Sequence, residues 1–182
     1  TYEFRRDSKK DTSLKRISNN GVVTDILYER IGVIDNSSPY ATYIYSPDYN
    51  ENYPFVNINV APSLKVVSEA KHTSSGQTQK QLYQYKGAVS NAEGLGFLGF
   101  KEFKKSNWFG DDVGQLWDVS KYDMQKRAAM TEQWVSTSSS SYIPSSFASK
   151  TTYTYSTQLL SNKVFVNVPT QIVREDGLQG IS

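Results

Sequence analysis

The sequence predicts an all-β fold made of long antiparallel strands in a curved meander sheet. Runs of alternating apolar and polar residues recur, and turn-forming residues separate them at intervals of roughly 8–12 residues. The connections are too short for parallel crossovers, which need about a dozen residues or more. The 182 residues include 13 tyrosines and eight phenylalanines, and aromatic and β-branched side chains favour pleated, half-buried surfaces.

The first predicted hairpin lies near the N-terminus. Residues 14–17 form its first strand and residues 22–30 form its return strand. Asn19-Asn20-Gly21 forms the turn, because Asn and Gly tolerate the positive φ that tight turns require. Residues 41–45 form a less regular strand that follows this hairpin.

The middle of the chain predicts further hairpins. Residues 47–54 form a polar turn region between two prolines. Ser74-Ser75-Gly76 is a second turn signal, and a long aromatic run follows the glycines near position 96. The predicted strands of this part cover residues 55–60, 64–71, 78–86 and 97–108.

The C-terminal part continues the pattern. Gly110-Asp111-Asp112 predicts a turn, and residues 123–130 predict a short helix or a loop equally well, since they contain good helix formers. Residues 138–146 form a polar, Ser-rich loop. The predicted strands of this part cover residues 115–122, 131–137, 148–156 and 163–173.

These elements suggest one β-rich segment over residues 14–175, with a flexible or linking end at residues 1–13 and a tail at residues 176–182. The chain begins without Met and shows no signal peptide, so we expect a mature or excised portion of a longer protein. No run approaches the roughly 20 apolar residues of a membrane helix. We therefore expect no membrane span.

Charge and cysteine content exclude several classes of function. The chain has 20 basic and 18 acidic residues, a net charge of +2, and the basic residues are scattered. Nucleic-acid binding proteins usually concentrate Lys and Arg on one face, so no nucleic-acid partner is predicted. The absence of cysteine excludes disulfides, thiolate nucleophiles and zinc sites with cysteine ligands.

No catalytic residue, metal ligand or cofactor-binding residue is predicted, and no cofactor is expected. The only histidine, His72, has no Gly-x-Ser-x-Gly elbow to accompany it, so a structural or exposed histidine is favoured over a triad member. Asp111-Asp112 lacks the spaced ligands of an EF-hand and predicts a solvated turn. The carboxylates show no spacing that singles out an acid/base pair; the candidates are Glu69, Glu93, Glu102, Asp111, Asp112, Asp118 and Glu132.

One glycine-rich segment stands out as a structural motif. Its glycines follow the Gly-x-Gly-x-x-Gly spacing of dinucleotide-binding proteins, but aromatic residues and a strand follow them instead of a helix. We expect the glycines to allow either a β-bulge or the close packing of an adjacent backbone. The motif residues are Gly94, Gly96, Phe97, Leu98, Gly99 and Phe100.

The same segment, Gly94-Leu95-Gly96-Phe97-Leu98-Gly99-Phe100, resembles the "Gly-Arg-Gly-Phe-Leu-Gly-Phe" signature of Rhs/YD-repeat toxin shell proteins. These include the middle region of the insecticidal toxin-complex B subunit and related virulence proteins. Tyr83-Gln84-Tyr85-Lys86-Gly87-Ala88 matches "Tyr-x-Tyr-x-Gly-Ala" just upstream. Residues 14–28 and 53–67 resemble further family stretches in the same order, and Leu95 replaces the usual Arg. The likeness covers residues 14–135.

The resemblance implies a non-catalytic structural segment of a large exported protein, secreted or at the cell surface. Strands of this family form the wall of a β-shell that encloses a toxic C-terminal domain. The expected partners are the rest of the same parent protein, the toxin cargo domain and export machinery. An isolated piece would leave sheet edges unpaired, so we expect them to pair with further strands.

A carbohydrate-binding or adhesive β-sandwich at the cell surface is the alternative. Exposed aromatic rings can stack on sugars, although core packing or cross-strand pairing is the more common use of such residues in sheets. A sandwich would show two packed sheets and an exposed aromatic cluster. The candidate stacking residues are Tyr40, Tyr43, Trp108, Trp117 and Trp134.

Overall fold

The computed structural model describes residues 2–3, 13–32, 44–110, 115–137, 147–161 and 165–177, and the side chains of all but the first two. These residues form an all-β structure, as predicted. The strands are β1 (Tyr2–Glu3), β2 (Arg16–Asn19), β3 (Val22–Ile31), β4 (Tyr45–Ser46), β5 (Phe55–Ile58), β6 (Ala61–Ser74), β7 (Gln77–Asn91), β8 (Gly96–Ser106), β9 (Trp117–Asp123), β10 (Ala129–Ser136), β11 (Phe147–Leu159) and β12 (Phe165–Asp176).

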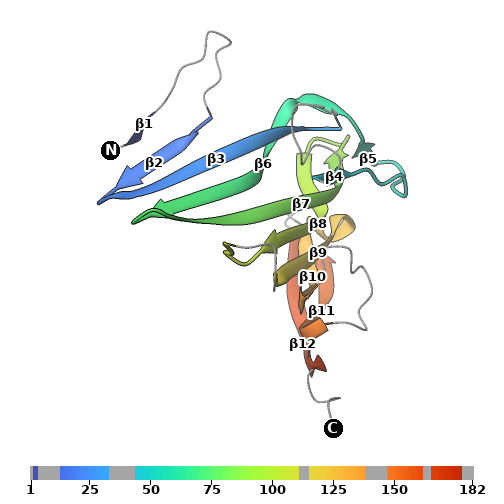
Figure 1. Ribbon diagram of the computed structural model, residues 1–182. Coiled ribbons are helices and arrows are strands. Elements are labelled where there is room, and N and C mark those ends of the chain that lie inside the picture. Colours follow the sequence, from blue (N-terminus) through green and yellow to red (C-terminus); the bar gives the residue numbers. More distant parts are fainter. Residues whose placement is uncertain are drawn as a thin grey trace.

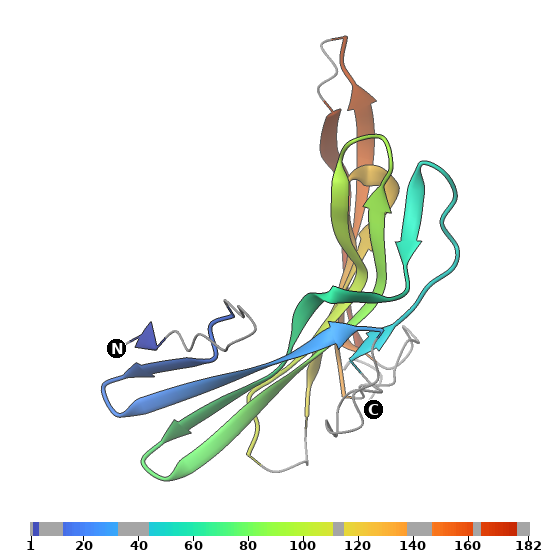
Figure 2. The same ribbon diagram turned by 90° about the horizontal axis from the view of Figure 1, so that it is seen from above.

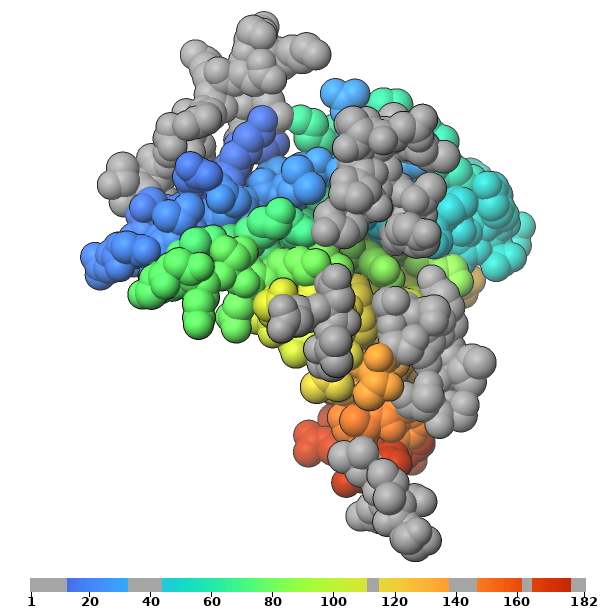
Figure 3. Space-filling view, in the orientation of Figure 1, coloured from blue at the N-terminus to red at the C-terminus, as the bar shows by residue number. Residues whose placement is uncertain are grey.

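All twelve strands belong to one large meander sheet, which is neither closed nor strongly curled. Its main order is β1-β2-β3-β6-β7-β8-β9-β10-β11-β12, and each neighbouring pair is antiparallel. The strands follow one another from the blue N-terminal end to the red C-terminal hairpin (Figure 1, Figure 3). The predicted antiparallel meander is therefore confirmed, apart from β4, which pairs with β7 in parallel over two residues.

Two of the three predicted tight turns lie within the described residues, and both are present. Asn20 and Gly21 connect β2 to β3 with φ values of 49° and 77°, and Ser75 and Gly76 connect β6 to β7 with φ values of 51° and 78°. Left-handed backbone at both central residues is the geometry that matches the twist of the flanking strands. The two hairpin turns project in the same direction from the rest of the sheet (Figure 2).

Strand β7 changes its neighbour half-way along. Residues Gln77–Leu82 pair with β6, but beyond Leu82 the same edge of β7 pairs with β4 and then β5. Among the described residues, residues 61–67 of β6 pair with β3 and not with β7. The β3–β6 pair thus separates from β7 and packs over it, and the hydroxyl of Tyr85 donates a hydrogen bond to the Val67 carbonyl at 3.0 Å.

The main core fills the space between these diverging strands. Its buried members are Ile31 of β3, Val66 of β6, Ala88 of β7 and Ile44 beside β4. Half-buried rings and aliphatic side chains complete it, namely Tyr45, Ile58, Ala61, Leu64, Tyr85 and Phe100. A second buried cluster of Trp117, Val119 and Trp134 lies on β9 and β10.

Several predicted elements differ in extent or type. Strands β6 and β7 are longer than predicted, at 14 and 15 residues. Of the predicted short helix or loop at 123–130, residues Met124–Lys126 form one turn of 3₁₀ helix whose N-terminal amides are capped by Asp123, and β10 already begins at Ala129. Within the predicted linking end, Tyr2–Glu3 forms β1.

Other predictions lie outside the described residues. These are the rest of residues 1–12, the start of the strand at 41–45, Asp111 and Asp112 of the turn predicted at residues 110–112, the Ser-rich loop 138–146 and the tail beyond Gly177.

Candidate functional site

The glycine motif spans the β7–β8 turn and the start of β8. Gly94 lies in the turn, and β8 begins at Gly96. The register with β7 shifts between Val89, which lies opposite Gly99, and Ser90, which lies opposite Phe97. Leu98 is therefore an extra residue on β8, so the motif contains a β-bulge.

The motif glycines are required by backbone conformation. Gly94, Gly96 and Gly99 have φ values of 103°, 69° and 115°, a region that residues with a Cβ rarely adopt. No described atom lies within 4 Å of the position that a Cβ would take at any of the three. Of the two alternatives drawn from the sequence, the described structure shows the bulge and no close approach of a second backbone.

The two phenylalanines of the motif occupy different environments. Phe100 packs with Tyr85, with ring centroids 4.7 Å apart, and belongs to the edge of the main core. Phe97 is 48% exposed and meets the Phe100 ring edge-on at 5.7 Å. Phe100 thus packs at the edge of the core, and Phe97 packs on Phe100 at the surface.

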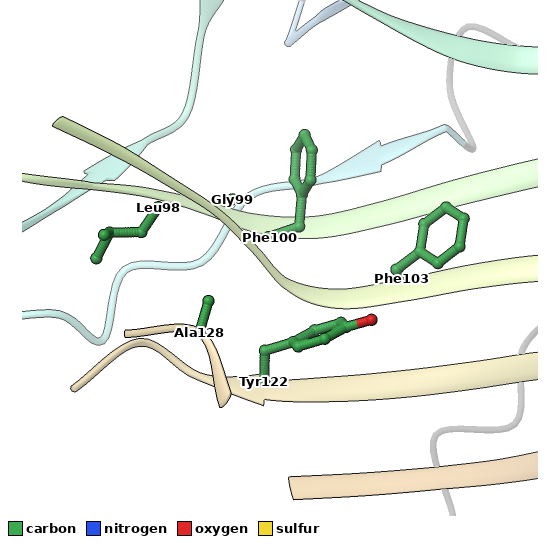
Figure 4. A pocket seen from close by; sticks show the side chains of 6 residues that line it. All are labelled: Leu98, Gly99, Phe100, Phe103, Tyr122 and Ala128. Atoms are coloured by element: carbon green, nitrogen blue, oxygen red, sulfur yellow. The ribbon is translucent and has the colours of Figure 1, made fainter. Parts of the chain in front are cut away.

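An open apolar pocket lies beside the motif, where β8 and β9 separate. In the described residues β9 pairs with β8 only over Glu102–Ser106, so the motif half of β8 extends beyond it. The pocket holds about 250 Å³ and carries no carboxylate, amine or imidazole. Its lining residues are Leu98, Gly99, Phe100, Phe103, Tyr122 and Ala128 (Figure 4). This lining can receive an apolar side chain, and the phenol of Tyr122 is its only titratable side-chain group.

Three of these lining residues were not among the predicted motif residues. Phe103 is part of the same strand and could be expected from its aromatic character. Tyr122 and Ala128 come from β9 and from the turn before β10. No local sequence signal links them to the motif, because they meet it only where the strands diverge.

A charged cluster fastens the loop before β5 to β8. The Lys101 ammonium lies 2.5 Å from Glu51 and 3.2 Å from Asp48. Burial alone would raise the pKa of Asp48, but the hydrogen bond and charge of Lys101 outweigh burial and lower that pKa below its usual value. Burial alone would lower the pKa of Lys101, and the two carboxylates raise it instead. Asp48 and Lys101 therefore favour their charged forms.

Three of the candidate carboxylates on the strands lie against lysines, namely Glu69, Glu102 and Glu132. Glu132 is bound by Lys150 at 3.0 Å and by Lys121 at 3.3 Å. Burial alone would raise the pKa of Glu132, but these two lysines lower it. Glu69 lies 3.0 Å from Lys71. Glu102 lies 3.5 Å from Lys104.

His72 lies in β6 and is half-buried. Its Nδ1 is 3.4 Å from the Thr24 hydroxyl, and its ring meets Trp108 edge-on at 5.7 Å. In the described part of the chain no group of three or more potential metal ligands is present. No helix among the described residues is long and apolar enough to cross a membrane.

The aromatic residues considered for sugar stacking are mostly occupied elsewhere. Trp117 and Trp134 are 2% and 1% exposed, so their faces cannot contact a sugar. Trp108 is 40% exposed and has its edge contact with His72. Tyr40 and Tyr43 lie outside the described residues. Core packing, the more common use of such residues, is confirmed for Trp117 and Trp134.

No family model, curated protein or solved structure matches the chain.

Proposed function

We propose that this chain is a non-catalytic structural segment of a large exported Rhs-like or toxin-complex-like protein. In this proposal its sheet is part of the wall of a hollow β-shell, which encloses a toxic C-terminal domain. The sheet curves into the shell only together with strands from the rest of the parent protein. The expected location is secreted or at the cell surface.

The observation that carries the proposal is the condition of β12. This strand has 12 residues and pairs, within the described residues, only with β11. All of its residues from Val168 to Asp176 are exposed; they include the apolar Val168, Ile172 and Val173 beside Pro169 and the charged residues 174–176. Edge strands of finished domains are usually short, charged or covered. A long edge with exposed apolar side chains fits a sheet that continues into further strands.

The architecture also favours a wall over a sandwich. A carbohydrate-binding sandwich would bury its core between two separate sheets. The described strands instead belong to one sheet, and the aromatic residues Trp117 and Trp134 are buried in it. Together with the ordered sequence resemblance, this supports the structural role.

Amide hydrogen exchange tests the proposal. The exchange of β12 is compared between the 182-residue chain and the full-length product of its coding region. We expect the amides of residues 168–173 that face away from β11 to exchange rapidly in the isolated chain and at least a hundredfold more slowly in the longer protein, since a new neighbour would accept hydrogen bonds from them. Pro169 carries no amide proton. Val119 of β9 is fully buried in this chain and pairs with strands on both sides, so its exchange should be slow in both proteins and serves as the control.

The proposal is wrong if β12 exchanges equally fast in both proteins, or if the coding region adds no further β-rich sequence. Limited proteolysis of the full-length protein then tests enclosure. A C-terminal domain that is cut as readily in the intact protein as when expressed alone is not enclosed.

A further inference from the structure

Strand β8 buries two opposite charges on one face of the sheet. Glu102 and Lys104 are only 4% and 2% exposed. Their charged atoms are 3.5 Å apart, and Oε1 of Glu102 has no hydrogen-bond partner among the described residues. Burying such a pair costs desolvation energy that the attraction between the charges often fails to recover. Stability alone is therefore a weak reason for these residues to be charged.

Glu102 belongs to a row of alternating charges that crosses the sheet, and Lys104 lies two residues further along β8. Lys86 of β7 lies opposite Glu102 of β8, which lies opposite Lys121 of β9, which lies opposite Glu132 of β10. Each neighbour in the row has the opposite sign. Such directly opposed pairs favour the observed register, and like charges in the same positions would disfavour it.

Of the three strand pairs that this row crosses, β8–β9 is the one whose register the turn cannot set. Residues 92–95 connect β7 to β8 and residues 124–128 connect β9 to β10, whereas residues 107–116 connect β8 to β9. Short turns fix strand register through their geometry, and long loops do not. The buried charges lie on β8, at the start of this long connection.

Apolar patterning cannot exclude a slip of two residues at this pair. A one-residue slip moves every side chain to the opposite face, but a two-residue slip leaves each on its own face. In one direction, that slip would place Lys104 opposite Lys121 and Glu102 opposite Asp123. Both would be contacts between like charges.

In the other direction, the same slip would place the buried Glu102 opposite the uncharged Val119, so that Glu102 would lose Lys121 as its opposite charge. The observed register alone pairs the charges favourably.

We infer that Glu102 and Lys104 act as a register lock, which selects one alignment of β8 on β9 by placing like charges together in the slipped alternative. The lock specifies the alignment more than it stabilises the sheet. This inference concerns the chain itself and does not depend on its place in a shell.

Engineered disulfides report the register directly, because the chain has no cysteine of its own. Lys105 lies opposite Asp118, so Lys105→Cys with Asp118→Cys crosslinks the observed register. Lys105→Cys with Ser120→Cys crosslinks only the slipped register. We expect Glu102→Gln with Lys104→Met to raise the slipped crosslink about tenfold relative to the unmodified background.

Two controls make the result specific. Arg16→Met with Asp25→Asn removes a cross-strand ion pair between β2 and β3 and should leave the crosslink ratio unchanged. Lys104→Met alone removes the contact between like-charged lysines in the slipped register together with the 3.5 Å pair with Glu102, and it is the second variant if the double variant fails to fold. If the slipped crosslink stays at its background yield in both folded variants, or rises equally in the Arg16 and Asp25 control, the register lock is refuted.

Discussion

The ammonium of Lys101 on β8 lies 3.2 Å from the carboxylate of Asp48, and this contact fastens the loop before β5 onto the strand that carries the glycine motif. Both side chains are mostly buried, at 19% and 12% exposed. The Asp48 side chain also lies close to Gly87, where a Cβ would approach it to 3.1 Å. The loop is thus held by charge and by close packing at the same point.

Replacing Lys101 should loosen this loop. We expect Lys101→Met to lower the free energy of unfolding by about 2 kcal/mol, because it leaves two partly buried carboxylates without their cation. Urea denaturation measures the change. Lys126→Met removes the more exposed pair with Asp123 and should cost no more than about 0.5 kcal/mol. Equal losses in the two variants would contradict the fastening role of Lys101.

Acid should weaken the fold through the carboxylates that are bound by lysines. The pKa values of Asp48 and Glu132 are lowered in the folded chain. Their stabilising contribution is therefore present above the usual carboxyl pKa of about 4 and is lost as the pH falls through the lower folded values. Unfolding free energy, followed by urea titration between pH 7 and pH 2, should decline below about pH 4. Glu132→Gln should reduce the slope of that decline, and an unchanged slope would exclude Glu132 as a contributor.

Gly99 should be sensitive to substitution for a conformational reason. Its φ of 115° disfavours any residue with a Cβ, while the space around it is open. We expect Gly99→Ala to destabilise the chain by about 1–2 kcal/mol in thermal or chemical unfolding. Gly110→Ala is the matched control, since its Cβ would meet only the Thr78 carbonyl at an ordinary 3.8 Å. A neutral effect at Gly99 would show that the bulge tolerates an ordinary residue.

The two motif phenylalanines should differ in their contributions to stability. Phe100→Ala removes ring contacts with Tyr85 and Tyr45 and should cost about 3 kcal/mol. Phe97→Ala removes a half-exposed ring and should cost less than about 1 kcal/mol. Chemical denaturation of both variants measures the difference. Equal costs would mean that the surface ring is packed as firmly as the inner one.

Local signals in the sequence predict the turns and much of the strand order. Asn20-Gly21 and Ser75-Gly76 determine their hairpins through the backbone of two residues each, so neither depends on distant contacts. The alternation of apolar and polar residues that predicts β5 to β8 is likewise a local signal. A helix or a loop was equally expected at residues 123–130, because helix propensity there competes with the capping side chain of Asp123 and an early start of β10.

The remaining features depend on pairings between distant residues. The change of neighbour along β7 arises because Tyr45 and Phe55–Ile58 pair where β6 has departed, and no local pattern specifies such an exchange. The pocket beside the motif also depends on residues that are distant in the sequence. Tyr122 and Ala128 reach Phe100 only because β9 turns away from β8.

The exchange of neighbours along β7 has a consequence for biosynthesis. The ribosome makes β4 and β5 well before residues 85–91, which are their strand partners in the described structure. The N-terminal hairpins can form as soon as they emerge, but β4 and β5 have to wait for the second half of β7. Assembly of the N-terminal half is therefore completed late, when the second half of β7 has been made and can pair with β4 and β5.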